Sequence, residues 1–208
     1  MSLINELQEV AETADILTVL RKAKRLSGKL NRNDILEWIK HELGGNFIEK
    51  QLPKYRIAKG NLYYYTNGFV PAGWGWMKSG ICPLTEIGLN NIEIEIKDSI
   101  TNLQTAVTSG LAYSLPSEID AIIRSDLYRD CQHMTFFILV SRLEIQRIIQ
   151  SVRDVVLDWA IKLEQEGVIG EKQSFTLEEK KKAADINITL VDNAVVGMID
   201  RHFGGTNV

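Results

Sequence analysis

A long amphipathic helix near the end of the chain constrains the fold more than any other feature. Ser141 and Glu144 form the Ser-x-x-Glu pattern of a capping box, in which both side chains accept hydrogen bonds from backbone amides at a helix start. Gly167 suits the C-terminal end. The chain between them predicts a helix of about 24 residues, roughly 36 Å long. Its apolar positions form a near-heptad stripe of Ile145, Ile148, Ile149, Val152, Val155, Val156, Trp159 and Leu163. We expect this helix to be the spine of the fold.

Three shorter helices are predicted within the first 45 residues from the helical spacing of apolar side chains. The first begins at Leu3. Asp15 is placed to cap the second, which Gly28 ends. Asn33 is the candidate N-cap of the third, which stops at Gly44-Gly45. Its apolar face consists of Ile35, Leu36, Ile39 and Leu43, with Trp38 at the margin.

The middle of the chain predicts strands as well as helices. Tyr55–Thr66 is aromatic and β-branched, and we expect two short strands around a turn at Lys59-Gly60-Asn61. Gly68–Gly80 is the longest irregular stretch. Further strands are expected at 92–96 and 135–140. Two helices are expected here, one after Asp98 that buries Ile100, Leu103, Val107 and Leu111, and one over 116–130.

These elements predict an α+β fold that is predominantly α-helical: a helical body with a small antiparallel sheet, a long C-terminal helix and a short β tail. A second capping box at Thr176 and Glu179 begins one more helix. We assign residues 1–185 to a single helical α+β domain, which suits a chain of 208 residues. Residues 186–208 form the tail, in which the alternation of Ile186, Ile188 and Leu190 with polar residues predicts a strand pair or hairpin.

Composition indicates a cytoplasmic protein. Cys82 and Cys131 are isolated, as in proteins of a reducing compartment. The first 15 residues carry acids and lack the apolar core of a signal peptide. The longest apolar run, 134–140, is far shorter than the ~20 residues of a membrane span. The net charge of -3 lacks the basic excess of a dedicated duplex-DNA binder, although a local patch stays open.

No catalytic motif is complete, so we predict no enzyme activity, no cofactor and no metal site. His41-Glu42 begins like HExxH, but Gly45 stands where the second histidine would be. Cys131 and His133 would share one face of a strand, so a Cys–His dyad is conceivable. The alternative is a buried, inert cysteine. The glycines near Trp74 do not have the spacing of a phosphate-binding loop.

Two surfaces are candidates for partner or ligand binding. The first is a basic cluster that could meet phosphates or an acidic partner, unless it is only a solvated helix face. The second is the pair Trp74 and Trp76 beside Tyr63–Tyr65, which could anchor a partner or unstacked bases, or could instead cover the core. The basic cluster comprises Arg21, Lys22, Lys24, Arg25, Lys29 and Arg32.

Three segments resemble the AbiTii domain of bacterial abortive-infection and phage-defence loci. They are LRKAKRLSGKLNRNDILEWIKHELGG (Leu20–Gly45), LPKYR (Leu52–Arg56) and the stretch Val152–Ala184. The most specific part is WAIKLEQEGVIGEKQSFT (Trp159–Thr176), and the resemblance extends over about Leu3–Asp185, more loosely between Asn61 and Asp130. The resemblance implies a setting in conflict systems and carries over no catalytic residues.

The sequence leaves three hypotheses. The first is a non-catalytic interaction and oligomerisation module of an abortive-infection or toxin–antitoxin-like system. It would form a homo-oligomer, bind a second protein of the same locus and have no membrane partner. The alternative is a nucleic-acid or nucleotide sensor that uses the basic helix and the tryptophan loop. The third is an enzyme whose polar groups converge only in the folded chain.

Overall fold

The computed structural model describes residues 2–47, 52–66, 70–72, 75–77, 80–83, 91–127, 134–171 and 174–186. This part of the chain holds seven α-helices and a small antiparallel sheet, so the predicted α+β, predominantly helical fold is confirmed. The chain divides into two compact units. The helical unit comprises Met1–Arg56, Glu95–Thr105 and Arg147–Val208. The sheet unit comprises Ile57–Ile94 and Ala106–Gln146.

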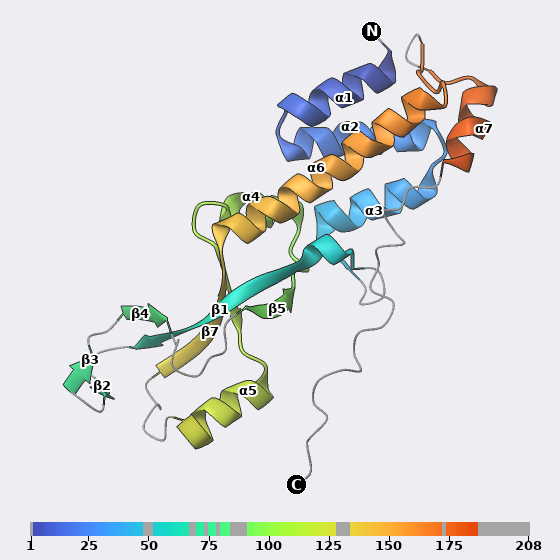
Figure 1. Ribbon diagram of the computed structural model, residues 1–208. Coiled ribbons are helices and arrows are strands. Elements are labelled where there is room, and N and C mark those ends of the chain that lie inside the picture. The colour runs from blue at the N-terminus through green and yellow to red at the C-terminus, as the bar shows by residue number, and fades with distance from the viewer. Residues whose placement is uncertain are drawn as a thin grey trace. The chain divides into compact units, whose positions relative to one another are not determined.

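The helical unit is built mainly from amphipathic helices (Figure 1). They are α1 (Leu3–Thr13), α2 (Ile16–Lys29), α3 (Asn33–Gly44), most of α4 (Ile100–Ala106), most of α6 (Arg142–Gln165) and α7 (Leu177–Asp185). Asp15 caps α2 as predicted, because its carboxylate accepts from the Leu17 and Thr18 amides. Ser2 caps α1 in the same way. Helix α1 is bound to α6 by Arg153, whose Nη1 donates to the Ala11 carbonyl at 2.5 Å.

Helix α6 matches its prediction at 24 residues. Six of its eight stripe residues are buried, namely Ile145, Ile148, Val152, Val156, Trp159 and Leu163, and Ile149 and Val155 are part-exposed. Ser141 Oγ accepts from the Glu144 amide at 3.3 Å, which is the serine half of the capping box. The Glu144 carboxylate also accepts from the Lys59 amide at 3.3 Å. Gly167 follows the helix at a φ of 75°, as a terminating glycine should.

The N-cap and the buried face of α3 differ from the prediction. Asn33 is the first helical residue, and Arg32 occupies the cap position without a side-chain cap bond. The buried side consists of Ile35, Trp38, Ile39 and Glu42. Leu36 and Leu43 are part-exposed. Trp38 is therefore a core residue. The prediction put Leu43 on the buried face, but the structure buries Glu42 instead, because a carboxylate is not expected in a core.

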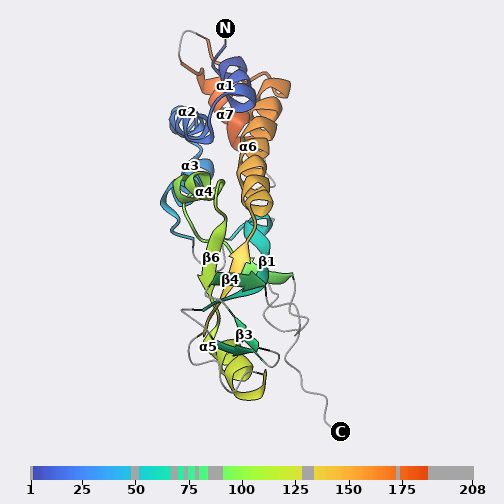
Figure 2. The same cartoon turned by 90° about the vertical axis from the view of Figure 1, so that its left-hand side faces the viewer.

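The sheet unit contains five strands in one sheet, of order β4–β1–β7–β6, with β5 also paired to β1. Their bounds are Ile57–Thr66 (β1), Gly80–Pro83 (β4), Ile92–Glu95 (β5), Leu111–Ser114 (β6) and Met134–Val140 (β7). Helix α5 (Ser117–Ile122) continues into a π-helical turn, Ile123–Leu127, and contributes to the core on one face of the sheet (Figure 2). That core consists of Leu62, Tyr64, Ile123, Phe136 and Ile138, against which Ile92, Ile94, Leu115, Ile119 and Met134 pack.

The predicted turn at Lys59-Gly60-Asn61 is wrong. These residues lie inside the continuous strand β1, which pairs with β7 from Gly60↔Val140 to Thr66↔Met134. Glycine is needed there for space rather than for a turn, since a Cβ at Gly60 would collide with Ile138 Cγ2. A glycine inside a strand marks such close approaches.

Three other local predictions need correction. The stretch Gly68–Gly80 contains two short antiparallel strands, β2 (Val70–Ala72) and β3 (Gly75–Met77), and is not wholly irregular. Helix α4 ends at Ala106, and Leu111 begins β6 instead of facing inward from that helix. Gly110, at a φ of 82°, turns the chain between them. Cys131, His133 and the tail beyond Ile186 lie outside the described residues.

Candidate interaction surfaces and a buried polar cluster

A buried ion pair connects α3 to the 3₁₀ turn Lys54–Arg56 that precedes β1. Arg56 Nη2 pairs with Glu42 Oε2, and both side chains are 0% exposed. Arg56 Nη1 donates to the Asp98 carbonyl at 2.6 Å and lies 3.4 Å from the Ile96 carbonyl. The guanidinium lies 4.6 Å from the centre of the Phe47 ring, a cation–π distance. Arg56 thus joins three segments of the helical unit.

Tyr55 extends this pair into a polar cluster of Trp38, Glu42, Tyr55 and Arg56. The Tyr55 hydroxyl donates to Glu42 Oε1 at 2.6 Å and accepts from Trp38 Nε1 at 2.8 Å. Burial, and then the negative charge of Glu42, raise the pKa of Tyr55 well above 10.0, so the phenol stays protonated. The cluster connects α3 to the turn before β1, because each of its side chains is hydrogen-bonded or ion-paired to another member.

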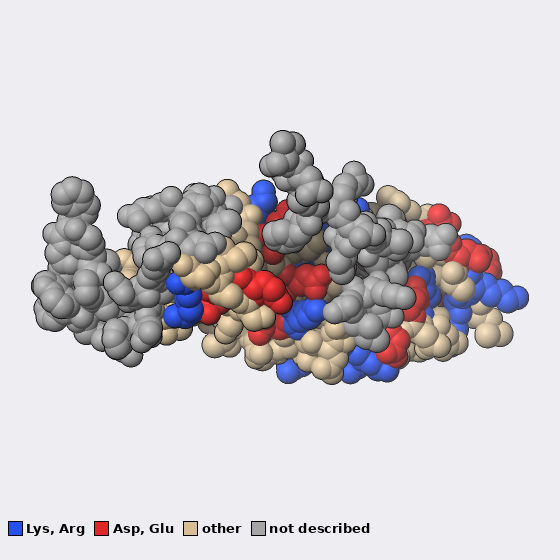
Figure 3. Space-filling view, turned by 90° about the horizontal axis from the view of Figure 1, so that it is seen from below, with Lys and Arg blue, Asp and Glu red and all other residues tan. Residues whose placement is uncertain are grey.

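The structure brings four of the predicted cations together on α2. Arg21, Lys24 and Arg25 are exposed and Lys29 is part-exposed, and their spacing places them on one side of the helix. We call these four residues the basic stripe. Lys22 lies beside them but pairs with Glu6 at 2.6 Å. Acidic and basic side chains are interspersed on the face seen in Figure 3. The basic stripe of α2 is therefore a local group of cations and not part of a uniformly basic surface.

Arg32 has a different position from the other predicted cations. It is only 6% exposed. Its Nη1 donates to the Ala183 carbonyl and, at 2.9 Å, to the Ile186 carbonyl, which are unpaired acceptors at the end of α7. Its Nε and Nη2 bind both oxygens of Asp34 at 2.9 and 2.6 Å. Arg32 therefore caps α7 from the α2–α3 connection.

The two tryptophans of the predicted loop are described only in part. Trp76 lies in β3, where it pairs with Pro71 of β2. Trp74 lies outside the described residues. Their role as contact residues stays a prediction.

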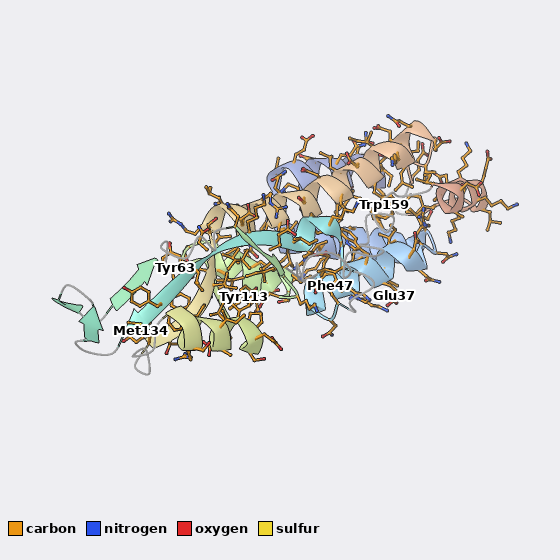
Figure 4. All side chains as sticks on the ribbon, turned by 60° about the horizontal axis from the view of Figure 1, so that its bottom comes forward. Glu37, Phe47, Tyr63, Tyr113, Met134 and Trp159 are labelled. Atoms are coloured by element: carbon orange, nitrogen blue, oxygen red, sulfur yellow. The ribbon has the colours of Figure 1, made fainter. Side chains whose placement is uncertain are left out.

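A group of apolar side chains lies on the sheet face opposite the core. Because side chains alternate along a strand, Leu62 and Tyr64 face the core while Tyr63 and Tyr65 face the other way. Phe137 lies directly opposite Tyr63 in the β1–β7 ladder, with ring centres 6.0 Å apart and planes inclined by 20°. Tyr63 is labelled on its strand in Figure 4. Tyr65 is 39% exposed. We call Tyr63, Tyr65, Phe137 and the part-exposed Leu139 the aromatic face.

The connection between α6 and α7, of which residues 166–171 and 174–176 are described, forms a corner organised by Glu179 of α7. Its carboxylate accepts from the amides of Ile169, Gly170 and Thr176 at 3.0, 2.9 and 2.7 Å. The predicted capping box between Thr176 and Glu179 is confirmed. Burial raises the pKa of Glu179, but these hydrogen bonds outweigh that effect and lower the pKa from its usual value of 4.5. The carboxylate therefore stays charged at neutral pH.

Two cavities flank the α6–α7 corner. One of about 270 Å³ is lined in part by Glu171, Ser174, Glu178 and Lys182. A second of about 460 Å³ lies toward the end of α7, around Lys162 and Asp185. Within the described ranges, no group of three or more His, Cys, Asp or Glu side chains could hold a metal ion. No helix among those ranges is long and apolar enough to cross a membrane.

Comparison with known proteins assigns the family. The family model AbiTii matches residues 2–188, which is most of the chain. The chain belongs to the AbiTii family. The name indicates a component of an abortive-infection system. No curated protein and no solved structure matches the chain at a significant level.

The AbiTii stretch Trp159–Thr176 builds the corner just described. Ile169 and Gly170 supply the carbonyls that accept from the Ile4 and Leu3 amides at the start of α1, at 3.2 and 3.1 Å. Gly170 has a φ of 67°, and a Cβ there would lie 2.6 Å from Phe175 Cε1. The motif thus has a structural task in this AbiTii chain. It closes α6, α7 and the N-terminus of α1 into one corner.

Proposed function

We propose that this AbiTii chain is a non-catalytic interaction and oligomerisation module of an abortive-infection system. In this proposal two copies associate through the aromatic face. The observation that carries the proposal is the position of Tyr63, Tyr65 and Phe137 on the side of the sheet away from its core. A one-sided antiparallel sheet normally carries polar residues on that side.

The chemistry of the aromatic face favours a protein surface as its partner. Aromatic side chains are enriched at protein interfaces and supply much of their binding energy. The rings of Tyr63 and Phe137 stack on one another on the two central strands. A second copy offers the same aromatic face, and a two-fold axis brings one patch against itself.

A second protein of the same locus would bind at the α6–α7 corner. Leu177 is 80% exposed there and Ile169 is 37% exposed, next to a cavity of about 270 Å³. The Glu179 carboxylate accepts hydrogen bonds from three backbone amides of the corner. A surface ordered before binding loses less entropy when it binds.

Light scattering after size exclusion, over a range of protein concentrations, tests the self-association. We expect the mass of the wild-type chain to rise toward that of a dimer with concentration. Tyr63→Ser together with Tyr65→Ser should weaken the association roughly tenfold or more, since interface aromatics commonly contribute over 1 kcal/mol each.

The matched control is Ile122→Ser on α5. Ile122 is an exposed apolar side chain of the same unit, at 54% exposure, and lies outside the aromatic face. This variant should associate like the wild type, and circular dichroism should show that both variants are folded. A wild-type chain that stays monomeric at several hundred micromolar would contradict the proposal, as would an equal loss in the control.

A further inference from the structure

We infer that the basic stripe binds the phosphodiester backbone of nucleic acid, with Gly28 as the point of closest approach. The inference goes beyond the proposed function, because the stripe lies on α2 in the helical unit and needs no second protein. It rests on three observations: an exposed glycine in a helix, the charge of that helix and the kind of side chains that it exposes.

Gly28 is a glycine that nothing in the described helical unit requires. It does not end α2 as predicted, because the helix continues to Lys29. It lies exposed in the last turn, and a Cβ there would meet no atom within 4 Å. Its conformation is helical, unlike the four glycines with positive φ. Its carbonyl accepts from the Leu30 and Asn31 amides, which any residue could do. Glycine weakens a helix relative to alanine, so a ligand that must come close to the backbone explains its presence.

The cations of the stripe surround this glycine. Arg21, Lys24, Arg25 and Gly28 follow the i, i+3, i+4, i+7 spacing of one helix face. Lys29 lies one turn beyond Arg25 and completes the stripe. Helix α2 holds five cations and no Asp or Glu in the sequence ILTVLRKAKRLSGK. Arg21 and Gly28 are separated by about 10 Å along the axis, a length over which a backbone presents several phosphates.

The side chains that α2 exposes favour phosphates over an acidic protein. The exposed positions are Thr18, Arg21, Lys24, Arg25 and Gly28, and none of them is apolar. Protein interfaces are built around apolar or aromatic anchors, which this helix face does not offer. Phosphate contacts need only cations, and they give affinity without base recognition. Two carboxylates border the stripe: Glu6 pairs with Lys22, and Asp15 caps the helix. The charge of Glu6 also acts on Arg25, and that of Asp15 on Arg21, so these two cations are partly neutralised.

Fluorescence anisotropy with short fluorescein-labelled oligonucleotides tests the inference. Single-stranded DNA, single-stranded RNA and duplex DNA are each titrated with the full chain at low and at physiological salt. We expect binding that weakens steeply with salt. The triple variant Arg21→Gln, Lys24→Gln, Arg25→Gln should lose affinity at least tenfold and flatten the salt dependence. Lys181→Gln, an exposed lysine on α7 of the same unit, is the control and should bind like the wild type.

Gly28→Ala is the decisive variant, because its two readouts move in opposite directions. Alanine should raise the melting temperature by about 2–4 °C, since it is the better helix former. It should also weaken oligonucleotide binding about threefold or more by holding the backbone away. Equal or tighter binding by this variant would overturn the inference. So would unchanged binding by the triple variant, salt-independent binding, or competition by polyglutamate as effective as by unlabelled oligonucleotide. The variant Tyr63→Ser, Tyr65→Ser should bind normally, which separates this inference from self-association.

Discussion

The two units of the molecule bury different kinds of side chain. Among the described residues, the buried polar or charged side chains are Ser27, Arg32, Glu42 and Arg56, and all four belong to the helical unit. The core cluster of the sheet unit consists of Leu62, Tyr64, Ile123, Phe136 and Ile138. Charge is thus buried where helices meet and not where strands pair.

Backbone hydrogen bonding explains this difference. Strands β1 and β7 pair over seven positions and also pair with the strands on their other sides, so their backbone groups bond within the sheet and their core needs no polar side chain. A helix leaves its first amides and last carbonyls unpaired. Arg32 binds carbonyls at the end of α7, and Arg56 binds those of the connection before α4. In the helical unit charged side chains therefore make the connections between elements.

Removal of Arg56 should have the largest effect on stability. Arg56→Met leaves the carboxylate of Glu42 buried without its cation, which should cost about 3–5 kcal/mol of the free energy of unfolding. Urea unfolding followed by circular dichroism measures this loss. The double variant Arg56→Met with Glu42→Leu should recover part of it, because no unpaired charge then remains in the core.

Lys40→Gln, on the same helix as Glu42, is the matched control. Lys40 pairs with Glu37 at 2.6 Å, but both side chains are about half exposed. Water already solvates such charges, so the urea midpoint should not change measurably. If Arg56→Met were as mild as this control, burial of the ion pair would not explain how the helical unit is held together.

The elements that the sequence predicts well are those with local signals. The capping box at Thr176 and Glu179, the cap at Asp15 and the 24-residue helix α6 all depend on residues a few positions apart. Gly60 was misread because its reason lies 78 residues away, at Ile138. Only the paired strand shows that the glycine makes space for a neighbour and does not turn the chain.

The buried polar cluster was missed for the same reason. Glu42 lies three residues after Ile39 and four after Trp38, so its spacing does place it on the buried side of α3. A carboxylate is expected to face solvent, and its partner Arg56 follows 14 residues later. The basic stripe is recognisable from charge alone. The burial of Arg32 cannot be predicted in this way, because it depends on hydrogen bonds to the distant carbonyls of Ala183 and Ile186.

A large-to-small change in the core of the sheet unit should destabilise the chain through lost apolar contact and not through an unpaired charge. Ile138 is 2% exposed and packs in the apolar cluster. Ile138→Ala should cost about 2–4 kcal/mol through lost apolar contact and the cavity left behind. Hydrogen exchange of the β1 and β7 amides locates the loss. Its size should be the same at low and high salt, since no charge is involved. A strong salt dependence would contradict the contrast between the two units.

Glu179→Gln should have the smallest of these effects and should make the helical unit respond differently to pH. Glutamine loses the negative charge, and its amide group must replace an oxygen that accepts from Ile169 and Gly170 or from Thr176. Loss of a capping interaction costs about 1 kcal/mol. Hydrogen exchange of those three amides at neutral pH should rise in the variant, while exchange in β1 and β7 stays unchanged.

The pH dependence follows from the lowered pKa of Glu179. Because its pKa in the folded chain lies below the usual 4.5, the carboxylate contributes stability above that value. The contribution is lost as the pH falls through the folded pKa. Wild type and Glu179→Gln should therefore differ at neutral pH, begin to approach one another below about pH 4.5 and converge once the pH is below the lowered pKa of the folded chain. A difference that persists undiminished in acid would show that the shape of the side chain, and not its charge, stabilises the corner. The contrast between a helical unit connected by charged side chains and an apolar sheet unit would then rest on the buried arginines alone.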